Sequence, residues 1–423
     1  MVTRRAIIKI GFAGGFLNGV PNLNSKQPVI RPFSYDSDDL ETVYSDNIYT
    51  RLLGVRPHLP AHEHITRLGG NRLRPEVLKS MRQANDFFVD MHQLNLAAGK
   101  RVAELIGAED AIITCGAFSS MLLASAACLT GTDMAKIESL PQVNWERSEC
   151  LIPYGHSFEY ERAYRCAGAS LVKPTSRTDL ATCLTKKTAF LAGLAIVEKQ
   201  NVFAPPLPLN KTTPVTNEVY LPIELIEFAN QREIPVIIDM ASDIPPKTNL
   251  TRFLDAGADL IAVSGGKAIG GPQSTGILAG KKELIQAARL NAYPNDQIGR
   301  GMKVSKEEII GLIIALEHFL ASDYDAEIDQ WNGRAKWLFK QLKQVPGLRP
   351  SYSPNTMGYA DVELSWDPEL IPLSEKQVKQ YLRDTEPRVE YLITLRTRLL
   401  TQQETEYLAK TLSRFFNAHR RKC

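Results

Sequence analysis

The chain has 423 residues, 44% of them hydrophobic and 23% charged, and a formal net charge of +3. These fractions are ordinary for globular proteins and exclude disordered and fibrous classes, while the length suits a large domain with a smaller partner. The basic residues form no long cluster of the kind found on nucleic-acid-binding surfaces. The six cysteines include no Cys-x-x-Cys pair. No apolar run approaches the ~18 residues of a membrane span. We therefore expect buried free thiols, no metal site and no membrane insertion.

The N-terminus carries a possible targeting motif. Two arginines, Arg4 and Arg5, precede two apolar residues and Lys9, and a weakly apolar, glycine-rich stretch follows. This pattern is similar to a twin-arginine export signal within residues 1–25, although a basic arm or an amphipathic first helix fits it too. Both a cytoplasmic and a periplasmic location stay open. We expect residues 1–60 to be a leader or an N-terminal arm.

Residues 61–300 are expected to form a large α/β domain. Apolar residues recur at helical spacing over 75–105, and residues 200–218 are rich in Pro, Thr and Asn and predict a loop. Between and after these segments strands and helices alternate, which favours a mostly parallel sheet with helices on both faces. The expected strands are 110–114, 189–197, 234–239 and 259–264, and the expected helices are 119–129, 223–231 and 250–256.

Residues 301–423 are expected to form a smaller α+β domain. A helix over 306–320 has Ser305 as its cap and Glu308 at its third position, which is the pattern of a capping box. A long amphipathic helix follows over 325–345. Two strands, 359–364 and 389–395, and a helix over 402–416 complete this part of the chain.

Lys267 is the leading candidate for a reactive residue. It follows a buried strand, and Gly265, Gly266, Gly270 and Gly271 flank it, so the backbone there can approach a ligand closely. An amine held among apolar strand ends has its pKa lowered, which makes it nucleophilic and suits Schiff-base chemistry. A glycine-rich loop that holds phosphate, or a surface lysine in a turn, would give a similar pattern.

Asp239 is the second candidate because it ends a buried strand that precedes the Lys267 strand. Neighbouring strands of this kind bring both groups to the carboxyl edge of one sheet, where ligands of open α/β sheets bind. Pyridoxal 5′-phosphate (PLP) needs an acid beside its ring nitrogen to act as an electron sink. An ordinary strand-end carboxylate that caps the next turn is the alternative.

Three further segments could hold the same cofactor. Gly116 and Ala117 lie in a small-residue turn before a helix, whose free N–H groups would bind a phosphate. Ser264, just before the lysine, could add a hydroxyl. His156 lies in a polar run and could stack on the cofactor ring, although a lone histidine is often structural.

Several segments together resemble a known family. They are Gly265–Leu278, Leu68–Val77, Gly107–Ala111, Cys128–Asp133 and Gly299–Ile309. They resemble bacterial selenocysteine synthase (L-seryl-tRNA(Sec) selenium transferase) and its relatives, which include D-glucosaminate-6-phosphate ammonia-lyase-like proteins. The resemblance runs from about residue 50 to the end. It implies the aspartate-aminotransferase fold type I and PLP as cofactor.

By this resemblance Lys267 matches the Schiff-base lysine and Asp239 the acid at the pyridine nitrogen. His156 falls where relatives stack a ring, and Gly116 and Ala117 fall in the phosphate turn. Phe118, and the turn after Asp239, depart from the synthase pattern, and we find no separate basic N-terminal module for tRNA.

The ammonia-lyase-like branch therefore fits better than the synthase. We expect α,β-elimination on a small amino acid or amino sugar acid in a homo-oligomer of at least two subunits. A transferase (of selenium or of an amino group) and a non-catalytic PLP-fold protein remain alternatives.

Overall fold

The computed structural model describes residues 39–200, 220–355, 358–390 and 394–421. The possible export signal and nearly all of the predicted loop over 200–218 lie outside these residues. No helix in the described part of the chain is long and apolar enough to cross a membrane. The cysteines at 115, 128, 150, 166 and 183 are free thiols, but the expectation that they are buried is correct only for Cys150, and Cys166 is exposed.

Residues 40–60 are more regular than the expected arm. They form helices α1 (Leu40–Ser45) and α2 (Ile48–Leu53) and strand β1 (His58–Pro60). Asn47 begins α2 with a capping box, and Gly54, at φ +66°, ends it. Two helices of six residues each are too short to show a periodic apolar pattern, which is why the sequence did not predict them.

The central element is a seven-stranded sheet of order β2-β8-β7-β6-β5-β3-β4. Strand β8 is antiparallel to both of its neighbours, and the other strands all run in one direction. The prediction of a mostly parallel sheet is therefore confirmed. The strands are β2 (Asp110–Thr114), β3 (Glu149–Leu151), β4 (Ser170–Val172), β5 (Thr188–Leu194), β6 (Val236–Asp239), β7 (Leu260–Ser264) and β8 (Gly276–Gly280).

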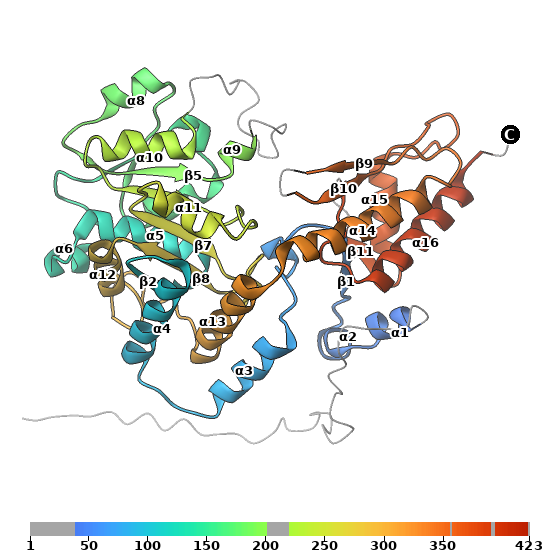
Figure 1. The fold of residues 1–423 in the computed structure, drawn as a ribbon, viewed down its shortest axis with the longest axis horizontal. Coiled ribbons are helices and arrows are strands. Elements are labelled where there is room, and N and C mark those ends of the chain that lie inside the picture. The colour runs from blue at the N-terminus through green and yellow to red at the C-terminus, as the bar shows by residue number, and fades with distance from the viewer. Residues whose placement is uncertain (1–38, 201–219, 356–357, 391–393, 422–423) are drawn as a thin grey trace, which may run out of the picture. The chain divides into compact units, whose positions relative to one another are not determined.

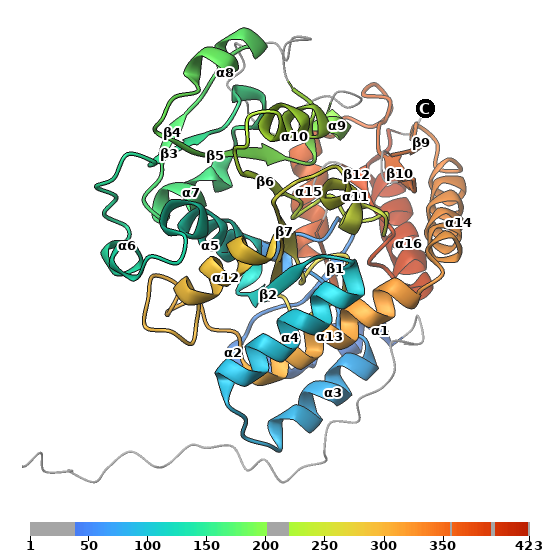
Figure 2. The same ribbon diagram turned by 60° about the vertical axis from the view of Figure 1, so that its left-hand side comes forward.

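Each face of the sheet has its own hydrophobic core. Along β7, Leu260 and Ala262 point into one core and Ile261 and Val263 into the other, as alternation along a strand requires. One core is covered by α5 (Gly116–Thr130), α7 (Arg162–Cys166) and α12 (Lys282–Asn291). The other is covered by α4 (Met91–Ile106), α10 (Pro222–Asn230), α11 (Asn249–Asp255) and α13 (Lys306–Ala321). Figure 2 shows α5 and α12 on one side of β7 and α11 on the other.

The helical stretch predicted over 75–105 is two helices, α3 (Pro75–Asn85) and α4, and Asp90 caps the second. Ser305 and Glu308 form the predicted capping box of α13. The remaining helices of this region are short: α6 (Met134–Ser139), α8 (Arg177–Cys183) and α9 (Val197–Gln200).

The C-terminal elements build a third core (Figure 1). They are α14 (Tyr324–Leu342), β9 (Ser351–Pro354), β10 (Ala360–Glu363), α15 (Glu375–Asp384), β11 (Arg388–Glu390), β12 (Thr394–Leu395) and α16 (Gln402–His419). Leu40, Tyr44 and Leu59 pack in this core, and β1 pairs in parallel with β11. Part of the expected N-terminal arm is thus built into the C-terminal core. The division of the chain near residues 60 and 300 stays a prediction, and α13 packs in a core of the large sheet.

Candidate functional site

The predicted site residues meet at the carboxyl edge of the sheet. Asp239, the last residue of β6, pairs in register with Ala262 of β7 on one side and with Leu194 of β5 on the other. Ser264, the last residue of β7, pairs with Gly276, which also pairs with Thr114 at the end of β2. Sheet register therefore places the ends of β2, β7, β6 and β5 in one row.

Lys267 lies in a tightly closed loop that leaves Ser264. The Gly265 N–H donates to Thr275 O, and the Gly271 N–H donates to Gly265 O, each over 2.9 Å. A Cβ at Gly266 would lie 2.4 Å from the Cα of Gln273, so only glycine fits there. The flanking glycines of the sequence are therefore needed to fold the chain back beside the lysine.

The Lys267 amine donates a hydrogen bond to Ser242 Oγ over 2.9 Å. Burial lowers the pKa of Lys267, and the nearby carboxylate of Asp239 only partly opposes this effect. The sequence predicted this direction from the buried strand before the lysine. An amine of this kind is more easily deprotonated and is a better nucleophile.

Asp239 is a buried carboxyl group with a 2% exposed side chain. Its Oδ1 accepts a hydrogen bond from the Ala241 N–H over 2.8 Å. Burial raises the pKa of Asp239 to about 6, against the opposing effects of the Ala241 hydrogen bond and the Lys267 charge. Among the described residues it forms no ion pair, so a protonated ring nitrogen would meet a carboxylate that lacks a cationic partner.

The predicted phosphate turn lies at the start of α5. Gly116 has φ +78°, and a Cβ added there would meet nothing within 4 Å. The N-cap residue, Cys115, makes no side-chain capping bond, so no side chain of the cap occupies the first N–H groups of the helix. Close backbone packing brings this turn to Gly276, which is the register partner of Ser264. Gly116, Ala117 and Ser264 can thus face one ligand.

His156 is completely buried beside the end of β5. Its Nδ1 accepts from the Leu194 N–H over 2.9 Å, and its Nε2 lies 2.7 Å from Tyr220 O, to which it donates. Burial lowers the pKa of His156 to about 4, so the ring is neutral at pH 7. Both nitrogens are engaged by the backbone, which leaves the ring face, rather than a proton, for contact with a ligand.

Several residues near Lys267 were missed by the sequence analysis. Ser242 contacts its amine, and the Asn71 side chain donates to Lys267 O over 3.2 Å. His64 lies within electrostatic reach of both Lys267 and Arg398, and burial lowers the pKa of His64 to about 3. Arg398, 6% exposed, lies 4.6 Å above the Trp331 ring and 3.5 Å from Glu63. None of these residues stands in a local pattern that marks it.

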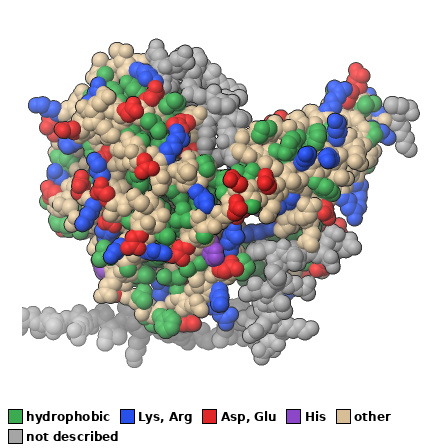
Figure 3. Space-filling view, viewed as in Figure 1, with side chains coloured by type: hydrophobic (Ala, Val, Ile, Leu, Met, Phe, Trp, Pro, Cys, Tyr) green, Lys and Arg blue, Asp and Glu red, His purple; other side chains and the backbone are tan. Residues whose placement is uncertain are grey.

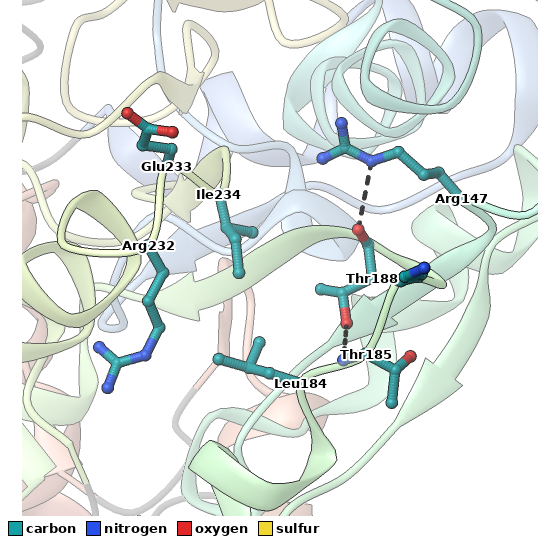
Figure 4. A pocket seen from close by; sticks show the side chains of 8 residues that line it. Arg147, Leu184, Thr185, Thr188, Arg232, Glu233 and Ile234 are labelled. Carbon is teal, nitrogen blue, oxygen red and sulfur yellow. Dashed lines mark hydrogen bonds between the residues drawn. The ribbon is translucent and has the colours of Figure 1, made fainter.

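A separate hollow lies at the opposite, amino edge of the sheet (Figure 4). Its volume is about 600 Å³, and its lining includes Arg147, Thr188, Arg232 and Ile234. These residues precede or begin β3, β5 and β6, whereas the candidate site follows the strand ends. The hollow is therefore distinct from the candidate site.

Comparison with protein families identifies the group to which these features correspond. The L-seryl-tRNA selenium transferase (SelA) family matches residues 95–329. A 5′-C-glycyluridine monooxygenase-decarboxylase from Streptomyces sp is 33% identical over 70% of this chain and 71% of that protein. A D-glucosaminate-6-phosphate ammonia lyase from Salmonella typhimurium is 29% identical over 64% of this chain and 70% of that protein. An L-seryl-tRNA(Sec) selenium transferase from Carboxydothermus hydrogenoformans is 27% identical over 62% of this chain and 55% of that protein.

Solved structures share the fold. A D-glucosaminate-6-phosphate ammonia-lyase structure superimposes with a TM-score of 0.74 and 23% identity, over 89% of this chain and 99% of that one. A serine palmitoyltransferase from S. paucimobilis, with PLP and myriocin bound, superimposes with a TM-score of 0.52 and 12% identity, over 83% and 84%. These superpositions confirm the predicted fold type I.

Proposed function

This chain belongs to the L-seryl-tRNA selenium transferase family and is a PLP-dependent enzyme, and on that premise we propose that it catalyses α,β-elimination on a small amino acid or amino sugar acid. The lyase relative supports this reading over selenium transfer. The chain spans 70% of that lyase but only 55% of the selenium transferase.

The proposal rests on the presence of Asp239 and Lys267 at one edge of the sheet. Burial raises the pKa of Asp239 and lowers the pKa of Lys267, so it favours the neutral form of each group. When bound, PLP supplies delocalisation of the electron pair that is left when an α-proton is removed. Lys267 would hold the cofactor, and its Nζ would take the α-proton. The carboxylate of Asp239 would keep the pyridine nitrogen protonated.

The other predicted residues position the cofactor. The N–H groups that follow Gly116 and Ala117, with the Ser264 hydroxyl, would hold the phosphate at the start of α5. The His156 ring, whose two nitrogens are both engaged by the backbone, would pack against the cofactor ring. The Ser242 hydroxyl accepts a hydrogen bond from the Lys267 amine and would bind this amine again whenever it is not attached to the cofactor.

A screen for ammonia and keto-acid release tests this function. Purified, PLP-loaded protein is given β-hydroxy amino acids and amino sugar acids, with Lys267→Ala as the inactive control. Release of both products without an added keto acid supports elimination. Turnover that depends on an added keto acid would instead identify a transaminase, and bound PLP without any turnover would identify a non-catalytic protein.

A second candidate is an oxidative decarboxylation, because the monooxygenase-decarboxylase relative is 33% identical. The same screen separates the two functions when it is run with an oxygen electrode. Elimination proceeds equally in air and under nitrogen, whereas the oxidative reaction consumes oxygen and stops without it.

We further propose a homo-oligomer. Helix α2 has no buried residue and exposes Ile48, Tyr49, Leu52 and Leu53, each by more than half. On the face shown in Figure 3, hydrophobic side chains are interspersed with Lys, Arg, Asp and Glu. Apolar residues exposed together favour contact with a second copy of the chain. Leu52→Glu should shift the sedimentation coefficient toward that of the monomer, and an unchanged coefficient would exclude α2 from the interface.

A further inference from the structure

The side chain of Asn71 lies outside the Lys267 loop and forms hydrogen bonds with two of its carbonyl groups. Its Nδ2 donates to the carbonyl of Lys267 over 3.2 Å and to the carbonyl of Gly271 over 3.1 Å. One amide group thus joins two carbonyls on either side of the turn that carries the lysine. The Lys267 carbonyl also accepts the Gly270 N–H over 3.0 Å, so its peptide plane is fixed from two directions.

The segment that carries Asn71 lies directly against this loop. A Cβ at Gly70, which has φ +71°, would lie 2.8 Å from the carbonyl oxygen of Gly266. On the other side of the same contact, Gln273 Nε2 donates to the carbonyl of Thr66. Backbone contact and side-chain hydrogen bonds therefore fasten residues 66–71 to residues 266–273.

The residue after Asn71 is anchored in the C-terminal core. Arg72 donates to both carboxylate oxygens of Glu404, over 2.6 and 3.1 Å, and Glu404 is fully buried at the start of α16. The hydroxyl of Tyr44 donates to the same carboxylate over 2.6 Å. A bidentate ion pair is a strong and directional contact, and here the carboxylate is fully buried while the Arg72 side chain is 35% exposed. Asn71 therefore cannot shift without disturbing either the ion pair or the lysine loop.

We infer that Asn71 is a positioning residue for Lys267, one whose side-chain amide fixes the peptide of the lysine while Arg72 and Glu404 hold that amide in place from the C-terminal core. The inference rests on the proposed role of Lys267 as the residue that carries PLP. It assigns a function to the Gly69–Arg72 segment, which contacts the lysine loop without belonging to it. Asn71 acts through the backbone of Lys267 and so is not itself a catalytic residue.

The carbonyl oxygen of the Asn71 side chain, Oδ1, has a consequence for ligand binding. This atom is buried and has no hydrogen-bond partner in the described part of the chain. Because Nδ2 is committed to two carbonyls, the orientation of Oδ1 is fixed as well. An acceptor in a fixed direction is satisfied by a donor on a bound ligand, which would strengthen the hold of Asn71 on the site once the ligand is present.

Two variants test the inference. Asn71→Ala removes the donor, and Asn71→Asp keeps the shape but turns a carboxylate toward two carbonyls. Asn291→Asp is the control, since Asn291 also donates to a carbonyl, over 3.0 Å, and also has a buried, unpartnered Oδ1, but Asn291 is fully buried and lies in α12. Each protein is stripped of cofactor and reloaded with PLP. Thermal unfolding checks that each variant folds.

We expect covalent attachment of PLP at Lys267 to slow by about tenfold in both Asn71 variants, because both lose the two hydrogen bonds that hold the loop. In Asn71→Asp the midpoint of the absorbance titration should also move to higher pH, since a nearby carboxylate favours a protonated lysine nitrogen. Asn291→Asp should attach PLP at the wild-type rate.

Wild-type attachment rates in both Asn71 variants would overturn the inference, and so would an equal slowing in Asn291→Asp. Borohydride labelling of the wild type distinguishes a failure of this inference from a failure of the proposed function. If the label is at Lys267 but the Asn71 variants behave as the wild type, only the positioning role is wrong. If the label is at another lysine, both the proposed function and the inference fail.

Discussion

The charges of Asp239 and Lys267 each counteract the effect that burial has on the pKa of the other residue. The positive charge of Lys267 lowers the pKa of Asp239, and the negative charge of Asp239 raises the pKa of Lys267, while burial moves both pKa values in the opposite directions and dominates. A ligand that brings a cation to Asp239 and a carbonyl group to Lys267 would satisfy both groups. PLP has these two features.

The first prediction concerns stability against pH. The pKa of Asp239 is raised from 3.8 to about 6, so between these values the folded cofactor-free protein keeps a proton that the unfolded chain has lost. Stability from this group therefore falls as pH rises from about 4 to 6, by about 3 kcal/mol. Asp239→Asn has no carboxyl group to titrate at this position. Its free energy of unfolding should therefore rise relative to that of the wild type as pH increases from about 4 to 6.

Denaturant unfolding of the cofactor-free wild type and Asp239→Asn at several pH values measures this difference. Taking the difference cancels the contributions of the buried histidines, which change in the opposite direction. A constant difference between the two proteins from pH 4 to 6 would mean that Asp239 titrates as an ordinary carboxylate.

The second prediction concerns chemistry. In Asp239→Asn the pyridine nitrogen loses its anionic partner, and exchange of the substrate α-proton should slow by roughly tenfold to a hundredfold, since a charge-assisted hydrogen bond contributes ~1.5–3 kcal/mol. PLP should still attach, because Lys267 is unchanged. Deuterium exchange followed by NMR measures the rate, and an unaltered rate would make Asp239 a structural strand-end residue.

Sequence reasoning predicted the position of a residue best where the pattern is local. The strand before Lys267 and its flanking glycines are one continuous pattern, and Asp239 ends the strand beside it. Ser242, His64 and Asn71 reach the lysine only through the folded chain, so no spacing could reveal them. Their approach to Lys267 is set by tertiary contacts, such as the close packing of Gly70 on Gly266.

The errors in the predicted elements also have physical causes. The apolar pattern over 75–105 continues through Phe87 and Phe88, but these side chains are 66% and 102% exposed and lie between two helices. Helix α5 begins at Gly116, which itself has φ +78°, and so starts earlier than the expected position at 119. Strand β8 has glycine at both ends and was not recognised within the lysine segment.

The third prediction uses two glycines of one helix. Gly116→Ala should weaken PLP binding, because a Cβ at φ +78° strains the turn proposed to hold the phosphate, at a cost of roughly 1–2 kcal/mol. Gly131, at the other end of α5, also has a positive φ, +54°, and open surroundings, so Gly131→Ala is the control that strains the backbone away from the phosphate. Equilibrium titration with PLP should show weaker binding for Gly116→Ala alone, and equal loss in both variants would refute the assignment.

The fourth prediction concerns the anchor of the Asn71 segment. Burial alone would raise the pKa of Glu404, but Arg72 and the hydrogen bonds around the carboxylate lower it. Glu404→Gln removes the charge that accepts both Arg72 hydrogen bonds and should destabilise the protein by about 1.5–3 kcal/mol, because the Arg72 side chain is 35% exposed and stays partly hydrated. Because the folded pKa is depressed, this stabilisation is present above the ordinary value of 4.5 and is lost as pH falls.

Glu317→Gln provides the matched control for this measurement. Glu317 pairs with Arg101 over 2.7 Å, but both side chains are more than one-third exposed, so the loss should be ~0–1 kcal/mol. Chemical denaturation of both variants at pH 7 gives the comparison. Equal losses would show that the pair of Arg72 with the buried Glu404 contributes no more than a surface contact.

The central claim is that Lys267 carries the cofactor, and the most direct test is to reduce the PLP-loaded protein with borohydride and map the label by peptide mass spectrometry. The account predicts a single labelled peptide with the pyridoxyl group on Lys267, and no label in Lys267→Ala of unchanged thermal stability. A label on any other lysine of the wild type, or an unchanged yield of label in Lys267→Ala, would contradict it.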